Sequence, residues 1–467
     1  ISLSSTLNSV AGHNYGLTVT AGTGSVTFTG AVGGTTPLGA VSISAGGLTT
    51  GSTFTVATNS NLSITTNSLS LGGNVKAAAS GGTGVLTIAP LTASTQINLG
   101  SGASNTGIAL TDAQLGYLSA SGGYFGGVVL GSASGTGAIA YNTSSNQTFG
   151  TALTIQSSSG AITASQTLNT GSSNLTISTG GAVSLSTVAG AGALSVTGTG
   201  ITLNGSVTTT GVDTYTGAIT LGASATLTGS SITTSSTITQ GSYNLTLSTD
   251  SLTLGGDITG SGSSVLTIAP KTSSTTVGLA GGAGTLALDT TILGRLKAPN
   301  LVIGSASGTG LMTINAFSAF DSTVQSVTLQ NSGSSGITVA GALDLGSNRN
   351  LTLTADALAL NAAITGGGTG ILTIQPQTST TKINLGLAAV TADGTGIGLT
   401  DVELSNITGS GFASMVIGKA SGASGAVVYN SAGNPTFTMP LTIQSGTGTI
   451  TASTALNTGT KTLTVSS

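Results

Sequence analysis

The chain has 467 residues, of which only 4% are Asp, Glu, Lys or Arg, and its net charge is −3. Typical soluble domains carry roughly 25% charged residues. Eight basic residues spread over this length cannot form the cationic stripe that phosphate neutralisation needs, so we exclude nucleic acid as a partner.

The composition also argues against disulfides, metal sites and transmembrane helices. The chain has no Cys and one His, which excludes disulfides and makes transition-metal sites very improbable. Ser, Thr or Gly interrupts the apolar runs well before the length of about 18 residues that marks a transmembrane helix. We therefore predict no transmembrane segment, no cofactor and no metal ligand.

The first residues, ISLSSTLNSV (1–10), contain no basic region and no cleavage pattern, so they do not read as a signal peptide. Alternation of apolar and small polar residues begins at once. We therefore expect the chain to be a piece of a longer protein.

Two-residue alternation continues through the whole chain. It is clear in LTIA (86–89), NLTIST (174–179), VSLS (183–186) and LTVS (463–466), with GG, SG, NG and TG turn signals between such runs. This period is typical of half-buried strands, and Thr, Val and Ile favour strands. Helical spacing is nearly absent.

Several passages recur in the same order. GVLTIAPLTASTQINLG (84–100) returns at 265–280 and 371–386, each time after a copy of NLSITTNSLSLGGNV (61–75), at 244–258 and 350–364. GIALTDAQLGYL (107–118) follows, with copies at 285–296 and 396–407. After it comes VVLGSASGTG (128–137), with copies at 301–310 and 415–425. Residues 152–178 return at 440–466. The repeats give about three modules of roughly 105–115 residues, which is typical of stacked architectures.

These repeats predict an all-β fold, a right-handed parallel β-helix (β-solenoid) with occasional short helical turns. We divide it into a partial repeat (1–67), a repeat module (68–181), a short insert module (182–250) and two further repeat modules (251–356 and 357–467). All of them belong to one continuous solenoid without linkers. With coils of about 20 residues, about 23 coils are expected. A string of β-sandwiches is the alternative, but it would need linkers between domains and larger aromatic residues in the cores. The sequence has no recognisable linker and few aromatic residues. We interpret the proline of LTIAP as the end of a strand at a recurring corner.

In these passages the chain resembles the filamentous-haemagglutinin-like class of large bacterial surface proteins, which are adhesins secreted by the two-partner or autotransporter routes. The resemblance is carried by residues 16–50, TYTGAITLGASATLTG (214–229), VIGSASGTG (302–310) and GIGLTDVELSNIT (396–408). It implies a right-handed β-helix, extracellular display at the bacterial cell surface and secretion as an unfolded chain. The secretion-recognition, anchoring and receptor-binding regions of such proteins are not identifiable here.

Four carboxylates are the best candidates for chemistry: Asp112, Asp289, Asp401 and Glu403. Parallel β-helices can host polysaccharide lyases and hydrolases, but the pattern T-x-x-E/Q at Thr111 and Thr400 is a capping box. We predict helical turns at about 111–118 and 400–407, with a looser middle copy that lacks the box. Because a glycosidase needs two carboxyl groups facing one another, we favour capping over catalysis.

The remaining candidates have structural explanations. His13 has no acid or nucleophile beside it in the sequence. The glycine-rich GSASGTG loops (131–137 and 304–310) lack the GK[ST] of a phosphate-binding loop, so we interpret them as turns. GGAGTLALD (281–289) begins like a calcium repeat but has Leu286 where Asp is needed. Lys271, Lys382 and Lys419 are interpreted as scattered solvated charges.

We therefore assign no catalytic, cofactor-binding or metal site and expect the chain not to be an enzyme. The first hypothesis is a structural shaft segment of a secreted bacterial surface adhesin or filament. The alternatives are a self-assembling extracellular filament or sheath subunit and a glycan-binding or glycan-processing β-helix. Expected partners are further copies, joined laterally or end to end, and host or neighbouring-cell surfaces or their glycans.

Overall fold

The fold is a parallel β-solenoid of about 20 turns, which confirms the predicted class. A computed structural model describes residues 1–102, 104–119, 124–144, 146–318, 320–386 and 396–467. It is nearly all β, with 49% strand and 4% helix. The chain divides into two compact units, Ile1–Ser236 and Thr237–Ser467, and the division falls inside the insert predicted at 182–250.

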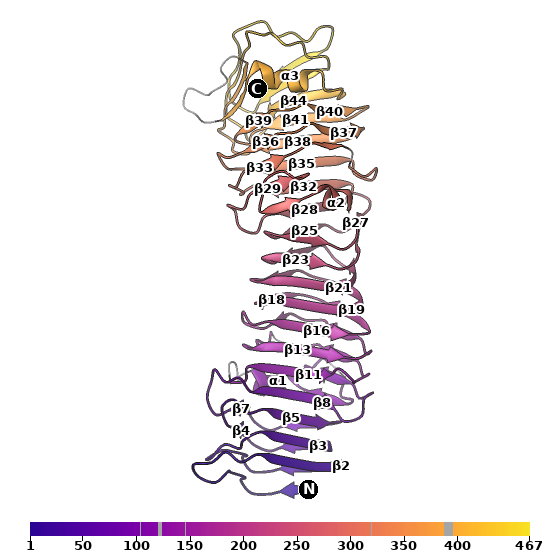
Figure 1. Ribbon diagram of the computed structural model, residues 1–467, viewed down its shortest axis with the longest axis vertical. Coiled ribbons are helices and arrows are strands. Elements are labelled where there is room, and N and C mark those ends of the chain that lie inside the picture. The colour runs from indigo at the N-terminus through magenta and orange to yellow at the C-terminus, as the bar shows by residue number, and fades with distance from the viewer. Residues whose placement is uncertain (103, 120–123, 145, 319, 387–395) are drawn as a thin grey trace. The chain divides into compact units, whose positions relative to one another are not determined.

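In the first unit, strands of successive coils lie side by side and form three columns (Figure 1). The longest strands, β2, β3, β19 and β21, run through two columns. The first column contains β2 (Leu17–Phe28), β3 (Val41–Thr50), β5 (Leu62–Thr66), β8 (Val85–Pro90), β11 (Gly127–Ser132), β13 (Ala152–Ser157), β16 (Leu175–Thr179), β19 (Leu194–Leu203), β21 (Val212–Leu221) and β23 (Ser231–Thr234). The second contains β1 (Ser2–Leu3), β6 (Leu69–Leu71), β9 (Ile97–Leu99), β10 (Ile108–Leu110), β12 (Ile139–Tyr141), β14 (Ile162–Ala164) and β17 (Ala182–Leu185). The third contains β4 (Phe54–Val56), β7 (Val75–Ala77), β15 (Leu168–Asn169), β18 (Val188–Ala191), β20 (Val207–Thr209) and β22 (Ala225–Thr228).

The second unit has the same three-column plan. Its main column contains β25 (Leu245–Ser248), β28 (Val265–Ala269), β32 (Asn300–Ser305), β35 (Ser326–Asn331), β38 (Asn350–Ala355), β41 (Ile371–Gln375), β44 (Ser414–Lys419), β46 (Leu441–Ser445) and β48 (Leu463–Ser466). The second contains β26 (Leu252–Leu254), β29 (Val277–Leu279), β30 (Leu286–Leu288), β33 (Met312–Ile314), β36 (Ile337–Val339), β39 (Leu358–Leu360), β42 (Ile383–Gly386), β43 (Ile397–Leu399), β45 (Val427–Asn430) and β47 (Ile450–Ala452). The third contains β24 (Ile238–Gly241), β27 (Ile258–Gly260), β31 (Leu296–Lys297), β34 (Phe317–Ser318), β37 (Leu343–Ser347) and β40 (Ile364–Gly367).

Equivalent side chains of successive coils stack directly on one another. Ile43 pairs with Ile64, and Ile64 pairs with Ile88, all in parallel register. Their exposed fractions are 0%, 1% and 0%. Thr65, between two such inward positions, faces outward and is half-buried. The alternation seen in the sequence therefore separates an apolar interior from a hydroxyl-rich outer face, as the pleat requires.

Coil length falls into two classes. Ordinary coils advance by 18 to 26 residues between paired positions, close to the predicted 20. Val183 to Ile201 is an 18-residue spacing and Met415 to Leu441 a 26-residue spacing. Three coils are much longer: Leu86 to Val128 (42), Leu266 to Leu301 (35) and Leu372 to Met415 (43).

The recurring proline stands at the end of its strand, as predicted. Pro90 is the last residue of β8, while Pro270 and Pro376 directly follow the ends of β28 and β41. Because proline has no N–H to donate to the ladder, strand pairing stops there and the chain turns the corner.

Truncation of an inward residue should destabilise the solenoid far more than truncation of its outward neighbour. Ile177 is 0% exposed in β16 and stacks between Ile155 and Val196. We expect Ile177→Ala to lower the free energy of unfolding by roughly 2–5 kcal/mol, because it removes buried methyl groups and leaves a cavity. Urea unfolding followed by circular dichroism measures this, with outward Thr176→Ala as the control. Equal midpoint shifts for both variants would contradict the inward stacking.

Candidate functional site

The predicted candidate carboxylates lie in the three long coils. Each of these coils contains one of the helices found in the described residues: α1 (Asp112–Ser119), α2 (Thr290–Gly294) and α3 (Asp401–Thr408). The helical turns predicted at about 111–118 and 400–407 are therefore confirmed. The middle helix is the shortest, with five residues. Helices of this length cannot cross a bilayer, so the described residues contain no helix long and apolar enough to do so.

The outer two helices begin with the predicted capping boxes. At α3, the Thr400 hydroxyl accepts from the Glu403 backbone N–H at 3.3 Å, and the Glu403 carboxylate accepts from the Thr400 N–H at 2.9 Å. At α1, Thr111 and Gln114 exchange the same two bonds at 3.3 and 3.0 Å. These bonds satisfy N–H groups that a helix start otherwise leaves free.

The middle helix is capped differently, because its sequence has no box. The carboxylate of Asp289 accepts the N–H of Ile292 at 2.8 Å, so Asp289 is itself the N-cap residue of α2. Its role is therefore the capping that we predicted.

Asp112 and Asp401 have a different role from the capping that we predicted. Each is the first residue of its helix, and its carboxylate reaches out to other loops. Asp112 accepts N–H groups from Ser101 at 2.9 Å and from Ser144 at 3.0 Å, and also the Ser144 hydroxyl. The hydrogen bond from the Ser144 hydroxyl, together with those from the backbone N–H groups of Ser101 and Ser144, lowers the pKa of Asp112 below its ordinary value.

The Asp401 carboxylate repeats this arrangement in the last module. It accepts the N–H groups of Ala432 at 3.1 Å and Gly433 at 2.8 Å. The Ser431 hydroxyl is the largest cause of the lowered pKa of Asp401. The residue of this module that aligns with Ser101 lies outside the described residues. Asp112 and Asp401 thus tie a long coil to the loop of the next coil.

The second oxygen of Glu403 is also engaged. Its Oε1 accepts the N–H of Leu360, at 3.0 Å, which is the last residue of β39. The four carboxylates singled out in the sequence therefore make structural hydrogen bonds to helix starts, loops and strands.

A set of polar contacts that sequence reasoning missed occurs three times among the described residues, once with each copy of the proline passage. We call it the Asx–threonine staple. The carboxylate of Asp250 accepts the N–H of Thr272 at 2.9 Å, the hydroxyl of Thr272 at 2.6 Å and the hydroxyl of Thr275 at 2.8 Å. The threonines belong to the coil after that of the aspartate. Asp356 makes the same contacts with Thr378 and Thr381. Asn67 contacts the same groups of Thr92 and Thr95: its side-chain oxygen accepts the Thr92 N–H and the Thr95 hydroxyl, and its amide donates to the Thr92 hydroxyl.

The staple explains why the sequence after the proline also recurs. Each proline is followed by the spacing T-x-x-T, and each partner Asn or Asp lies in the preceding repeat passage. The signal was therefore present in the aligned repeats. It could not be interpreted without knowing which coil lies beneath which.

A second recurrent contact explains the Asn that begins the NL motifs. The side-chain oxygen of Asn61 accepts the N–H of Val85 in the next coil at 2.9 Å. Equivalent bonds of 2.9 to 3.1 Å join Asn174 to Ala193, Asn244 to Val265, and Asn350 to Ile371. Each Asn therefore extends the backbone ladder by one bond beyond the strand.

The other sequence candidates are structural or dispersed. His13 is exposed and stacks on Tyr15 with ring centroids 5.2 Å apart. Gly131, which opens a GSASGTG loop, has a φ of +97°, and a Cβ there would lie 2.0 Å from the carbonyl oxygen of Gln156. Glycine is thus needed for the backbone, as the turn interpretation predicted. In GGAGTLALD, Leu286 is buried in β30.

The lysines singled out in the sequence are dispersed: Lys271 and Lys419 are half-buried, Lys382 is exposed, and they lie in separate coils. Lys297 forms ion pairs with Asp257, directly before β27, at 2.6 Å and with Asp321 at 3.9 Å. Across the described part of the chain, no group of three His, Cys, Asp or Glu residues is placed to hold a metal ion.

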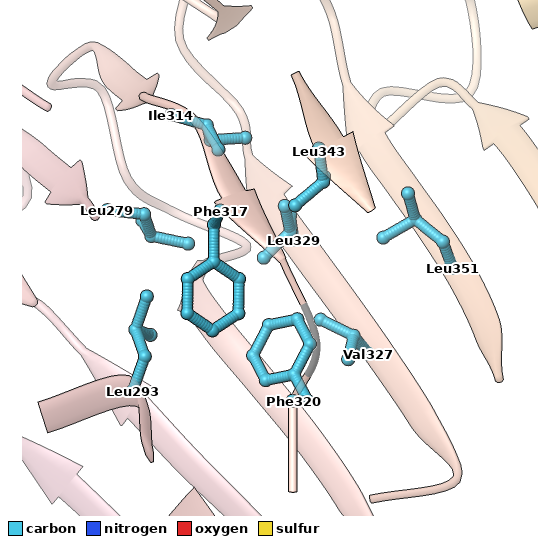
Figure 2. Close-up of a pocket in the computed structure, with 9 residues that line it drawn as sticks. All are labelled: Leu279, Leu293, Ile314, Phe317, Phe320, Val327, Leu329, Leu343 and Leu351. Atoms are coloured by element: carbon cyan, nitrogen blue, oxygen red, sulfur yellow. The ribbon is translucent and has the colours of Figure 1, made fainter. Parts of the chain in front are cut away.

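An enclosed cavity in the second unit is too small and too apolar for a ligand site. It has a volume of about 10 Å³, at the lower limit for one water molecule. Figure 2 shows the rings of Phe317 and Phe320 pointing into it; the centroids are 4.9 Å apart. Leu279, Leu293, Ile314, Val327, Leu329, Leu343 and Leu351 complete the lining. It is a packing gap where the long coil of α2 meets the regular stack.

Two shallow surface grooves in the first unit have volumes of about 220 and 370 Å³. Ser, Thr, Asn and Gln side chains, with a few aliphatic ones, line both, and no titratable group takes part. This lining supplies no acid, base or nucleophile of raised reactivity.

Comparison with known proteins adds no relative from which a role could be transferred. No family model, no curated protein and no solved structure matches the chain. Of the proposed resemblance, the structure supports the β-solenoid repeat architecture, and no match supports the adhesin family.

Loss of one Asx–threonine staple should weaken the second unit. We expect Asp250→Ala to lower the free energy of unfolding by roughly 1 kcal/mol, because three hydrogen bonds between coils are lost. Asp250→Asn should retain most of the stability, since Asn67 contacts the same groups in the first module. Urea unfolding of both variants measures the difference. Equal destabilisation by the two substitutions would show that charge, and not the bonding pattern, is what matters.

The same carboxylates should make stability depend on acid. Partial burial raises the pKa of Asp250, but hydrogen bonds from Thr272 and Thr275 outweigh it and leave the pKa below 3.8. The pKa values of Asp112, Asp321 and Asp401 are also lowered. A group with a lowered folded pKa stabilises the fold above its unfolded pKa, and that contribution is lost as the pH falls through the folded value. We therefore expect urea midpoints to fall as the pH drops below about 4 and to change little above about pH 5. A midpoint that rises below pH 4 would contradict this.

Proposed function

We propose that the chain is a structural shaft segment of a large secreted bacterial surface protein, an adhesin or filament, and that it performs no catalysis. The proposal rests on one observation, which is that the polar side chains of the repeats bind other parts of the same chain. The candidate carboxylates, the Asx–threonine staples and the NL asparagines all bind the chain's own backbone or hydroxyl groups. A β-solenoid built in this way fits a repetitive structural role.

The mechanism of such a segment is mechanical. Each coil pairs with its neighbours through parallel backbone ladders and adds stacked Leu, Ile and Val to a continuous interior. Burying one such side chain contributes roughly 1.5–3 kcal/mol. Because each coil contacts only its neighbours, length can be gained by repetition without a new core.

Extracellular display belongs to the same proposal. It is supported by the resemblance of residues 16–50 and 396–408 to bacterial surface adhesins. A chain without cysteine can cross a membrane unfolded without forming disulfides on the way. Adhesion itself would reside in regions beyond these repeats. Glycan binding has no specific observation in its favour, because neither surface groove contains a charged or aromatic side chain.

The proposal predicts a protease-resistant segment displayed outside the cell that makes it. Antibodies against residues 152–236 should bind the folded chain on intact cells, and electron microscopy of labelled cells should show the label outside the envelope. The protein should withstand digestion because its strands are paired on both sides. Ile268→Asp, which puts a charge at a fully stacked position, should be digested much faster than Thr267→Asp on the outer face.

Label confined to the cell interior would overturn the surface role. Rapid digestion of the unsubstituted protein would overturn the role as a shaft.

A further inference from the structure

One set of polar side chains in the repeats is not bound to the rest of the chain. The first column of the first unit is a continuous ladder of ten strands, β2 to β23, each paired in parallel with the next. One outward position of each strand stacks on that of the next, from Thr18 in β2 to Thr233 in β23. We call these positions the hydroxyl row. All of them are Thr or Ser except Val129 in β11.

The hydroxyl groups of this row take no part in holding the coils together. Thr154, Thr176, Ser195 and Thr214 stack on one another and are half-buried. No side chain of the row makes a hydrogen bond to a described residue, whereas the threonines of the staples do. These hydroxyl groups are therefore available to a group outside the chain.

The same face contains both of the shallow grooves described above. The groove of about 220 Å³ lies between two outward rows that stand two residues apart on β16, β19 and β21. The hydroxyl row forms one wall, and Val212, which is 47% exposed, belongs to the other. The groove of about 370 Å³ lies at the ends of neighbouring strands of the column and includes Ser178 and Thr197. Both grooves cross successive coils, so each can take a row of small side chains that follows the ladder.

The face also lacks the charges that usually keep surfaces apart. The chain has eight Lys and Arg and eleven Asp and Glu, but of these only Lys76, Asp112 and Asp213 lie in the first unit. Lys76 is in β7 of the third column, Asp112 begins α1, and Asp213 is 0% exposed. Depletion of charge marks the core of protein interfaces, and a surface with little charge promotes association.

A second copy of this face is the partner that fits the hydroxyl row. Strands stack about 4.8 Å apart, so the row repeats at that interval, and only a partner with the same interval can meet it along its whole length. Another copy of the chain has that interval by construction. A hydroxyl group both donates and accepts, so the row can bond to itself, as a contact between identical surfaces requires.

The area of the face is sufficient for a stable dimer. Ten strands at about 4.8 Å make a ladder roughly 45 Å long, and strands of five or six residues are about 17–20 Å long. The face therefore measures about 800 Å², which equals the roughly 800 Å² per partner of a standard interface. Figure 1 shows the strands of this column as parallel bands, one after another. Only overlap of the whole ladder provides this area.

We propose that the first column packs face to face on the first column of a second copy, with the hydroxyl rows of the two copies in contact. The contact is isologous. Overlap of the whole ladder brings the two copies of Thr154, in β13 near its middle, close to the twofold axis. The proposal gives the structural role above a partner and rests on it.

Sedimentation velocity of the purified 467-residue protein over a wide concentration range tests this contact with two matched variants. Thr154→Lys places two ammonium groups near the axis and should weaken dimerisation by at least about tenfold, or about 1.4 kcal/mol. Thr163→Lys is the control, because Thr163 is an exposed outward residue of β14 in the second column, and this variant should still dimerise. Circular dichroism checks that both variants are folded.

A mixture of oppositely charged variants provides the decisive readout. Thr154→Lys and Thr154→Asp should each be monomeric at a concentration at which the wild-type protein is dimeric, and their mixture should form heterodimers. A monomeric wild-type protein would overturn the proposal. So would association that Thr154→Lys leaves unchanged, equal loss with Thr163→Lys, or a mixture that stays monomeric. Each of these failures leaves surface labelling and protease resistance unchanged, so it is distinguishable from failure of the structural role.

Discussion

The structure depends on the in-register parallel pairing of equivalent strands from successive coils. A coil of about 20 residues cannot bury its own apolar face, but the next coil can cover it. Because the side chains of a strand alternate with a period of two, a slip of one residue would turn every Leu and Ile outward. The pairing of Ile43, Ile64 and Ile88, or of Leu353, Ile374 and Ile417, shows this constraint being met coil after coil.

The second level of organisation is polar and acts between coils. Charged residues are scarce, and several of the carboxylates, such as Asp250, Asp289 and Asp401, accept backbone N–H groups. The staple of Asp250 and the ladder bond of Asn244 both join a residue to the following coil, 21 to 25 positions later. Such contacts also favour one register over its alternatives, since an aspartate meets its two threonines only when the coils are correctly aligned. Neutral Asn67 contacts the same set of groups, so the geometry and not the charge is what the modules share.

The long coils show how the repeat accommodates extra sequence. In each, one additional strand, paired with a strand of the second column, and a short helix are inserted, and the chain then returns to the column that it left. Capping boxes and Asp289 give these helices defined starts, and Asp112 and Asp401 fasten the neighbouring loops to them. Similar excursions in other β-solenoids could carry chemistry. Here the polar groups of the described excursions bind the chain itself, which is why the structural role is the better supported one.

The sequence alone determined the fold class, the alternation of inward and outward residues, the strand-ending prolines and the two outer helices. All of these depend on local periods and local hydrogen bonds, such as that of Thr400 with Glu403, which short stretches of sequence contain. Only the tertiary structure decided that Asp112 and Asp401 join neighbouring loops instead of capping, and that Asp250 faces Thr272 and Thr275. These features depend on which coil lies against which. The lengths of the intervening coils, from 18 to 43 residues, set that pairing without leaving a fixed spacing in the sequence.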